Sequence, residues 1–124
     1  MASFRREWAA HPLMSLKTSD PRMREMLRAM IMRYPGNDLA EPDVIAGMSG
    51  ASAPLGSIDL PVLLITGDQD LPSRNQAADQ LAAQWARAER AVIAGAGHLP
   101  NLDNPKGYNA VVRTFLERHA TSRG

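Results

Sequence analysis

Residues 61–94 contain a short apolar run, an amphipathic stretch and a second apolar run, and this order limits the possible folds more than any other feature. The continuous apolar run 62–66 is typical of a strand in a parallel sheet. Ser73 and Gln76 have the spacing of a capping box, which predicts that a helix begins there. Residues 91–94 are expected to form a second strand. Strand, helix and strand in this order indicate a right-handed βαβ unit, and therefore an α/β fold.

Two short parallel strands make a poor sheet, because independently stable sheets generally need three or more strands. Both strands would also have open edges, which favour pairing with another chain. We therefore expect residues 58–124 to be one edge of a larger sheet, closed by a final helix that starts at Asn104 and Pro105. The other strands would come from a missing N-terminal half or from a second copy in a homo-oligomer.

Residues 1–57 have a helical pattern and are predicted to form a separate cap-like segment and linker. Asp20 is placed to cap a helix whose first turn begins at Pro21, and Pro35 with Gly36 ends that helix. A shorter helix is expected over 4–10.

Three methionines recur at helical spacing inside the longer helix, namely Met23, Met26 and Met30. Methionine adapts to irregular shapes, so this stripe could line a pocket for an apolar acyl group. Helical spacing favours ordinary packing in the core instead.

Composition excludes several classes of function. The 124 residues have a formal net charge of +1, few aromatic residues and no cysteine. We therefore expect no nucleic-acid partner, disulfide framework or thiolate metal site. The longest aliphatic stretch, residues 62–65, is too short to span a bilayer. These features predict a soluble, cytoplasmic protein without a membrane partner.

Asp70 and His98 each follow a predicted strand. Because sites in open α/β sheets form outside the carboxyl ends of the strands, these two side chains are expected at the same edge. A carboxylate beside an imidazole fixes the ring tautomer and stabilises the imidazolium that forms when histidine takes a proton. The sequence therefore predicts an acid–base pair there.

Residues 60–70, with the sequence LPVLLITGDQD, resemble the late strand and acid loop of α/β-hydrolase-fold enzymes. Residues 94–105, AGAGHLPNLDNP, are similar to the catalytic-histidine loop and following helix start of that family. The order and separation of the two motifs also agree with the family. The resemblance covers roughly residues 58–119, and the methionine-containing region is similar to the end of a cap domain.

This resemblance implies that Asp70 is the acid and His98 the general base of a catalytic triad, with no metal or organic cofactor. It also implies an N-terminal nucleophile, usually serine in Gly-x-Ser-x-Gly and sometimes aspartate or cysteine. The nearest imitation surrounds Ser49, but it lacks the last glycine and the strand–turn–helix context, so we expect no nucleophile in these residues and no activity from them alone. The implied activity is hydrolysis of a small ester or lactone by the complete enzyme. The alternative is a non-catalytic truncated homologue that oligomerises through its strand edges.

Other titratable residues compete for these roles. Asp68 lies one residue apart from Asp70, with Gln69 between them, and could also supply the acid. The family spacing from Gly67 favours Asp70 for that role, and Asp68 is expected to cap or solvate the loop. Asp103 is interpreted as a solvated or helix-flanking charge. His119, near a helix end, is expected to have a structural role.

Overall fold

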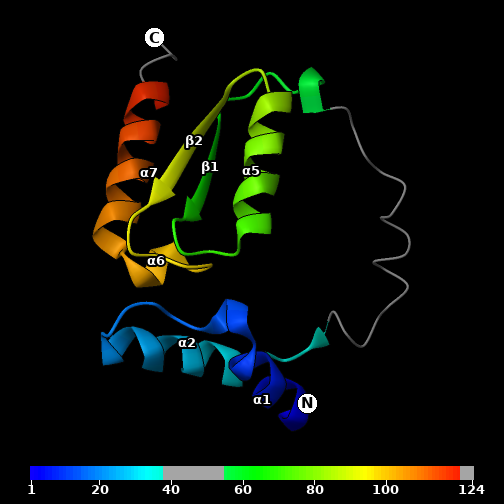
Figure 1. The fold of residues 1–124 in the computed structure, drawn as a ribbon, viewed down its shortest axis with the longest axis vertical. Coiled ribbons are helices and arrows are strands. Elements are labelled where there is room, and N and C mark those ends of the chain that lie inside the picture. The colour runs from blue at the N-terminus through cyan, green and yellow to red at the C-terminus, as the bar shows by residue number, and fades with distance from the viewer. Residues whose placement is uncertain (38–54, 121–124) are drawn as a thin grey trace.

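A computed structural model describes residues 1–37 and 55–120 of the chain. Figure 1 shows a layer of helices formed by the N-terminal residues below a unit that contains the strands and the C-terminal helices. The described helices and strands, in chain order, are α1 (Ala2–Ala10), a 3-10 turn (Pro12–Met14), α2 (Pro21–Arg33), a second 3-10 turn (Leu55–Ser57), β1 (Val62–Gly67), α5 (Pro72–Gln84), β2 (Ala88–Ile93), α6 (Pro100–Asp103) and α7 (Pro105–Ala120).

The strands β1 and β2 form a parallel, two-stranded sheet, joined by α5. Their register pairs Val62 with Ala88 and continues to Gly67 opposite Ile93. In Figure 1, α5 lies beside β1 and α7 lies beside β2, so that the strands run between these two helices. The predicted βαβ unit with a final helix is therefore confirmed. Its register also makes both strands end at the same level, next to the N-terminal helices.

Helix α2 begins where its local sequence signals predict, whereas α1 ends as predicted at Ala10 but begins two residues early, at Ala2. The Asp20 carboxylate caps α2 by accepting a hydrogen bond from the Arg22 amide at 2.9 Å. Helix α1 packs on α2 through an aromatic cluster, in which the Trp8 and Tyr34 rings meet edge to face with centroids 5.2 Å apart. The Arg5 guanidinium adds a hydrogen bond of 2.7 Å to the Tyr34 carbonyl oxygen. These contacts join the two helices into one layer.

The predicted burial of the methionine stripe on α2 is wrong. Met26 and Met30 are 49% and 60% exposed, whereas Ile31 is only 3% exposed and is the buried side chain of this helix. Helical spacing identified an apolar face but could not show which part of it would meet another element. The core of the described residues is formed by six small or aliphatic side chains, namely Leu16, Ile31, Ala78, Ile93, Ala96 and Leu102.

Two element boundaries in the βαβ unit also differ from the prediction. Helix α5 begins at Pro72, with Leu71 at the N-cap and no side-chain cap, so Ser73 lies inside the helix and no capping box forms. Strand β2 begins at Ala88, three residues before the apolar run. The start was missed because Glu89 and Arg90 are charged and interrupt the apolar pattern. In the structure both side chains bond to groups on other helices, which lets them lie in the strand.

No helix within residues 1–37 and 55–120 has the length and apolarity that crossing a bilayer requires. The division of the chain at residues 57 and 58 into two units stays a prediction. The two parts are nevertheless bonded to each other, since backbone amides before α2 donate to Asp103 of α6.

Candidate active site

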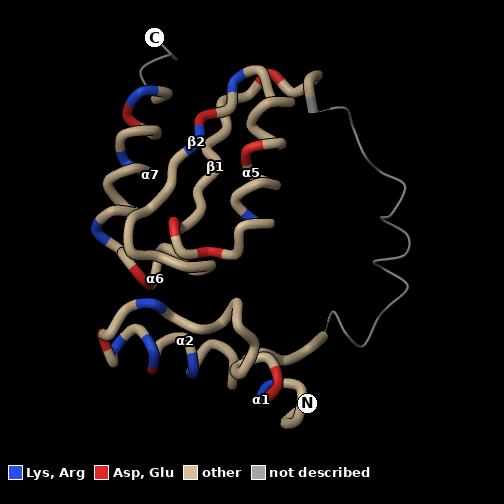
Figure 2. The backbone as a smooth tube through the Cα atoms, in the orientation of Figure 1, with Lys and Arg blue, Asp and Glu red and all other residues tan. Residues whose placement is uncertain are grey.

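The carboxyl ends of β1 and β2 bring two loops together. Because Gly67 is opposite Ile93, the loop after each strand starts at the same level of the sheet. The Asp68 amide donates to the Ile93 carbonyl at 3.0 Å, and the Gln69 amide donates to the Ala96 carbonyl at 2.7 Å. The two loops are thus held by backbone hydrogen bonds. Figure 2 shows acidic residues in the loop after β1, close to the N-terminal layer.

Asp70 and His98 meet across these loops. The Asp70 Oδ2 atom lies 3.1 Å from the His98 Nδ1 atom. The Asp70 side chain is 4% exposed and the His98 side chain 34% exposed. The second Asp70 oxygen, Oδ1, accepts from the Leu71 amide at 2.7 Å, which fixes the carboxylate. The structure therefore brings together both residues selected from the sequence, with a buried acid behind a partly exposed ring.

Two glycines allow this approach. Gly95 has a φ of +69°, a conformation that residues with a β-carbon rarely adopt, and it turns the chain between β2 and His98. A β-carbon on Gly67 would lie only 2.2 Å from the Ala96 carbonyl oxygen. The first glycine is required by backbone conformation, and the second by the closeness of the two loops.

Asp68 and Asp103 are both hydrogen-bonded to the histidine loop. Asp68 Oδ1 accepts from the Ala96 amide at 3.1 Å, so it caps a backbone group of the neighbouring loop. Asp103 Oδ2 accepts from the Gly97 amide at 2.8 Å, and its Oδ1 accepts from Lys17 and Thr18. Asp103 flanks a helix as one of the two expected alternatives, at the end of α6, but the other alternative, a solvated charge, is wrong. No local signal reveals these contacts, because two of the three donors are more than 80 residues away in the chain.

The other two histidines do not join this pair. His11 Nδ1 accepts from the Leu13 amide at 3.1 Å, as the cap of a 3-10 turn. His119 Nε2 lies 3.1 Å from Glu89 Oε2, and its ring packs on Phe115, as expected of a structural residue. Ser49 lies outside the described residues. Within the described ranges there is no group of three or more metal-ligating side chains.

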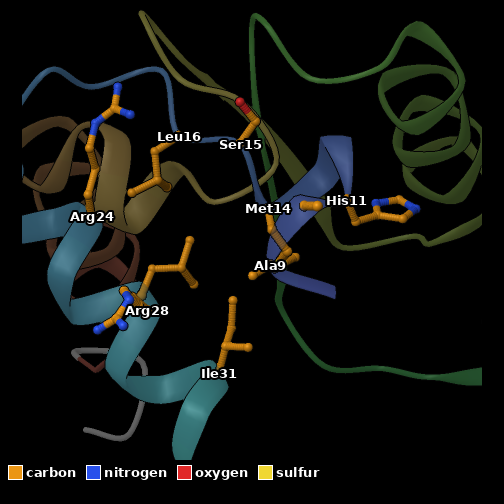
Figure 3. Close-up of a pocket in the computed structure, with 10 residues that line it drawn as sticks. Ala9, His11, Met14, Ser15, Leu16, Arg24, Arg28 and Ile31 are labelled. Atoms are coloured by element: carbon orange, nitrogen blue, oxygen red, sulfur yellow. The ribbon is translucent and has the colours of Figure 1, made fainter. Parts of the chain in front are cut away.

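Two pockets lie in the N-terminal layer. The first, of about 390 Å³, lies between α2 and the turn after α1; Leu16 and Ile31 point into it, while the His11 ring points away (Figure 3). The second, of about 500 Å³, is almost entirely apolar. Its lining includes Trp8, Met30 and Leu99, the residue after His98. Only the second pocket therefore reaches the histidine loop.

Comparison with known proteins agrees with this architecture. A family model described as the alpha/beta hydrolase fold matches residues 3–105. A solved structure, that of MenH from S. aureus, superposes with a TM-score of 0.74 at 16% sequence identity. The superposition covers 94% of this chain but 45% of that one, so the chain spans less than half the length of this solved relative. A search of curated proteins found no match. On the family match and the shared fold, this chain belongs to the α/β-hydrolase fold family.

Proposed function

We propose that Asp70 and His98 are the acid and the general base of a serine-type hydrolase site that acts on small esters or lactones. The observation that carries the proposal is the 3.1 Å contact between Asp70 Oδ2 and His98 Nδ1. A buried carboxylate on Nδ1 favours the tautomer in which Nε2 is free to accept a proton. The His98 side chain is partly exposed, as a ring that meets a reacting group must be.

The proposed reaction proceeds in two balanced steps. His98 Nε2 takes the proton of the nucleophile hydroxyl as that oxygen bonds to the substrate carbonyl carbon, and Asp70 stabilises the imidazolium. The proton then passes to the departing alkoxide as the ester C–O bond breaks. Water repeats the sequence on the acyl intermediate and releases the acid. These steps require no metal or organic cofactor.

The N-terminal segment, residues 1–57, is proposed to cap this site. Support comes from the apolar pocket of about 500 Å³, because Leu99 and Met30 line it together. An apolar acyl or alcohol group of the substrate would fit this lining better than a charged one. The proposed partner is thus a small, apolar ester, in a protein that we expect to act in the cytoplasm without nucleic acid.

The second candidate function is a non-catalytic protein that associates through its strand edges. It is favoured by the exposure of Val92, a strand residue that is 54% exposed in the two-stranded sheet. An exposed apolar strand edge pairs readily with another strand. Light scattering after size exclusion tests it: an oligomer that Val92→Lys converts to a monomer supports this candidate, and a monomer over a wide concentration range contradicts it.

An ester assay tests the catalytic proposal. Any hydrolysis of p-nitrophenyl butyrate by the purified chain would show that these residues do contain a nucleophile, and it should vanish in His98→Ala and fall by about 10⁴-fold in Asp70→Asn, the loss known for the wrong histidine tautomer in a triad. The matched control is His119→Ala, since His119 also lies 3.1 Å from a carboxylate. Its rate should equal that of the unmodified chain.

Ser49→Ala tests the nucleophile in the same assay, and retained turnover would exclude Ser49. Turnover that survives His98→Ala contradicts the catalytic proposal. A chain with no turnover at all, together with the oligomer described above, supports the second candidate.

A further inference from the structure

Asp103 joins three backbone amides from two distant parts of the chain. Its Oδ1 accepts from the Lys17 amide at 2.6 Å and from the Thr18 amide at 2.9 Å. Its Oδ2 accepts from the Gly97 amide at 2.8 Å. One oxygen therefore serves the segment before α2, and the other serves the residue immediately before His98. In Figure 1, α6, which carries Asp103 at its end, lies between the sheet and the N-terminal layer.

A carboxylate suits this position because each of its oxygens can accept more than one hydrogen bond, and the negative charge strengthens them. An asparagine would offer one acceptor oxygen and would present an NH₂ group to the other amides. The Lys17 side chain also covers the histidine loop, since a β-carbon on Gly97 would lie 3.3 Å from it. The contact between the two segments is therefore both polar and packed.

Asp68 also binds the histidine loop. It accepts from the Ala96 amide at 3.1 Å, while Asp103 accepts from the next amide, that of Gly97. Two consecutive amides before His98 are thus bonded to carboxylates from different elements. Asp68 belongs to the acid loop and touches none of the N-terminal amides that Asp103 binds, so it provides a natural control.

We propose that Asp103 is a positioning residue, which couples the docking of residues 15–20 to the orientation of His98 through the Gly97 amide. The inference rests on the proposed role of His98. When the N-terminal segment is docked, Asp103 is held by the Lys17 and Thr18 amides and in turn fixes Gly97. Without that docking, Asp103 loses two of its three donors, and the Gly97 amide, next to His98, is held less firmly, while Asp68 still binds the Ala96 amide.

Amide hydrogen exchange and ¹⁵N spectra of the histidine rings, recorded on the whole chain, test the coupling. Asp103→Ala should accelerate exchange at Lys17, Thr18 and Gly97 by about 10- to 100-fold, because hydrogen bonds to a charged group are the stronger kind. It should also lower the population of the Nδ1–H tautomer of His98. Asp68→Ala should accelerate exchange at Ala96 and leave Lys17 and Thr18 unchanged.

Asp103→Asn keeps the side-chain volume but has one acceptor oxygen. Amide exchange should therefore accelerate either at Lys17 and Thr18 or at Gly97, and not at both. Two outcomes overturn the proposal: an unchanged His98 tautomer when the three amides are released, or cooperative unfolding of both Asp103 variants, which would make the residue a general support of the fold. Neither spectrum needs substrate or a nucleophile. Turnover that survives His98→Ala with the coupling intact would therefore refute the proposed function alone, and His98-dependent turnover with the coupling absent would refute this inference alone.

Discussion

Gly67 and Ala96 approach each other so closely that a β-carbon on Gly67 would lie 2.2 Å from the Ala96 carbonyl oxygen and 2.3 Å from that of Gly97. Both obstacles are backbone atoms, so the loops must separate to admit a methyl group. We predict that Gly67→Ala lowers the free energy of unfolding by about 1–3 kcal/mol, the usual cost of overpacking. The same change should weaken the contact between Asp70 and His98.

Urea unfolding and the ¹⁵N spectrum of the His98 ring measure these two effects. Gly56→Ala is the control, because a β-carbon at Gly56 would meet its nearest neighbour, the Gln84 carbonyl oxygen, at an ordinary 3.8 Å. A Gly67→Ala chain with unchanged stability and an unchanged His98 spectrum would show that the loops are not in close contact.

Adjacent residues of α2 should respond differently to truncation. Ile31 is 3% exposed, so we predict that Ile31→Ala lowers the free energy of unfolding by about 2–5 kcal/mol, through lost burial and the cavity it leaves. Met30 is 60% exposed, and Met30→Ala should change stability by less than about 0.5 kcal/mol. Chemical denaturation of both variants measures the difference. Equal losses would mean that the methionine face of α2 is covered after all.

Stability should depend on pH through Glu89. Hydrogen bonding to His119 and to Arg118 holds the pKa of the Glu89 carboxyl below its ordinary value, with His119 the larger cause. A carboxyl whose pKa is lower in the folded chain stabilises the fold above its unfolded pKa. Below the unfolded pKa, the unfolded chain binds a proton at Glu89 that the folded chain does not yet bind. The stabilisation therefore decreases with falling pH and is lost as the pH falls through the folded pKa.

We predict that Glu89→Gln lowers the melting temperature at neutral pH, and that the difference from the unmodified chain disappears in acid, below the folded pKa. Thermal unfolding monitored by circular dichroism across this range measures both. The control is Glu117→Gln, at an exposed position of α7, the helix that carries Arg118 and His119; this change should leave the difference between neutral and acid pH as it is in the unmodified chain. A Glu89→Gln chain whose deficit persists in acid would exclude the ionic contribution.

Local signals in the sequence predicted the elements whose causes are local. Asp20 caps α2, and an apolar run forms β1. Strand β2 was predicted too short because its first charged residues are bonded from elsewhere: Arg90 to Asp79 of α5, and Glu89 to His119 of α7. Such partners are many residues away in the chain, so an apolar pattern cannot show them.

The residues of the candidate site likewise divide into those that local sequence could predict and those that it could not. Asp70 and His98 could be selected because each follows a strand and because their flanking residues resemble a family. The contacts of Asp103 could not be predicted, because its donors are backbone amides and every residue except proline has such an amide. Which of these amides meet a carboxylate depends on how the N-terminal segment lies against α6. That arrangement belongs to the tertiary structure, so no local sequence pattern shows it.

The parallel register of β1 and β2 has a consequence for insertions and deletions. Because Gly67 is opposite Ile93, the meeting of Asp70 and His98 depends on residue counts within the two strands and their loops, and not on the length of the connection through α5. Removing one residue from either strand would shift its loop by about 3.3 Å and turn every side chain beyond the deletion to the other face. The meeting of the two loops therefore tolerates substitutions in the strands but no change in their length, whereas residues added at the C-terminal end of α5, beyond its bonds to β1 and β2, would leave it in place.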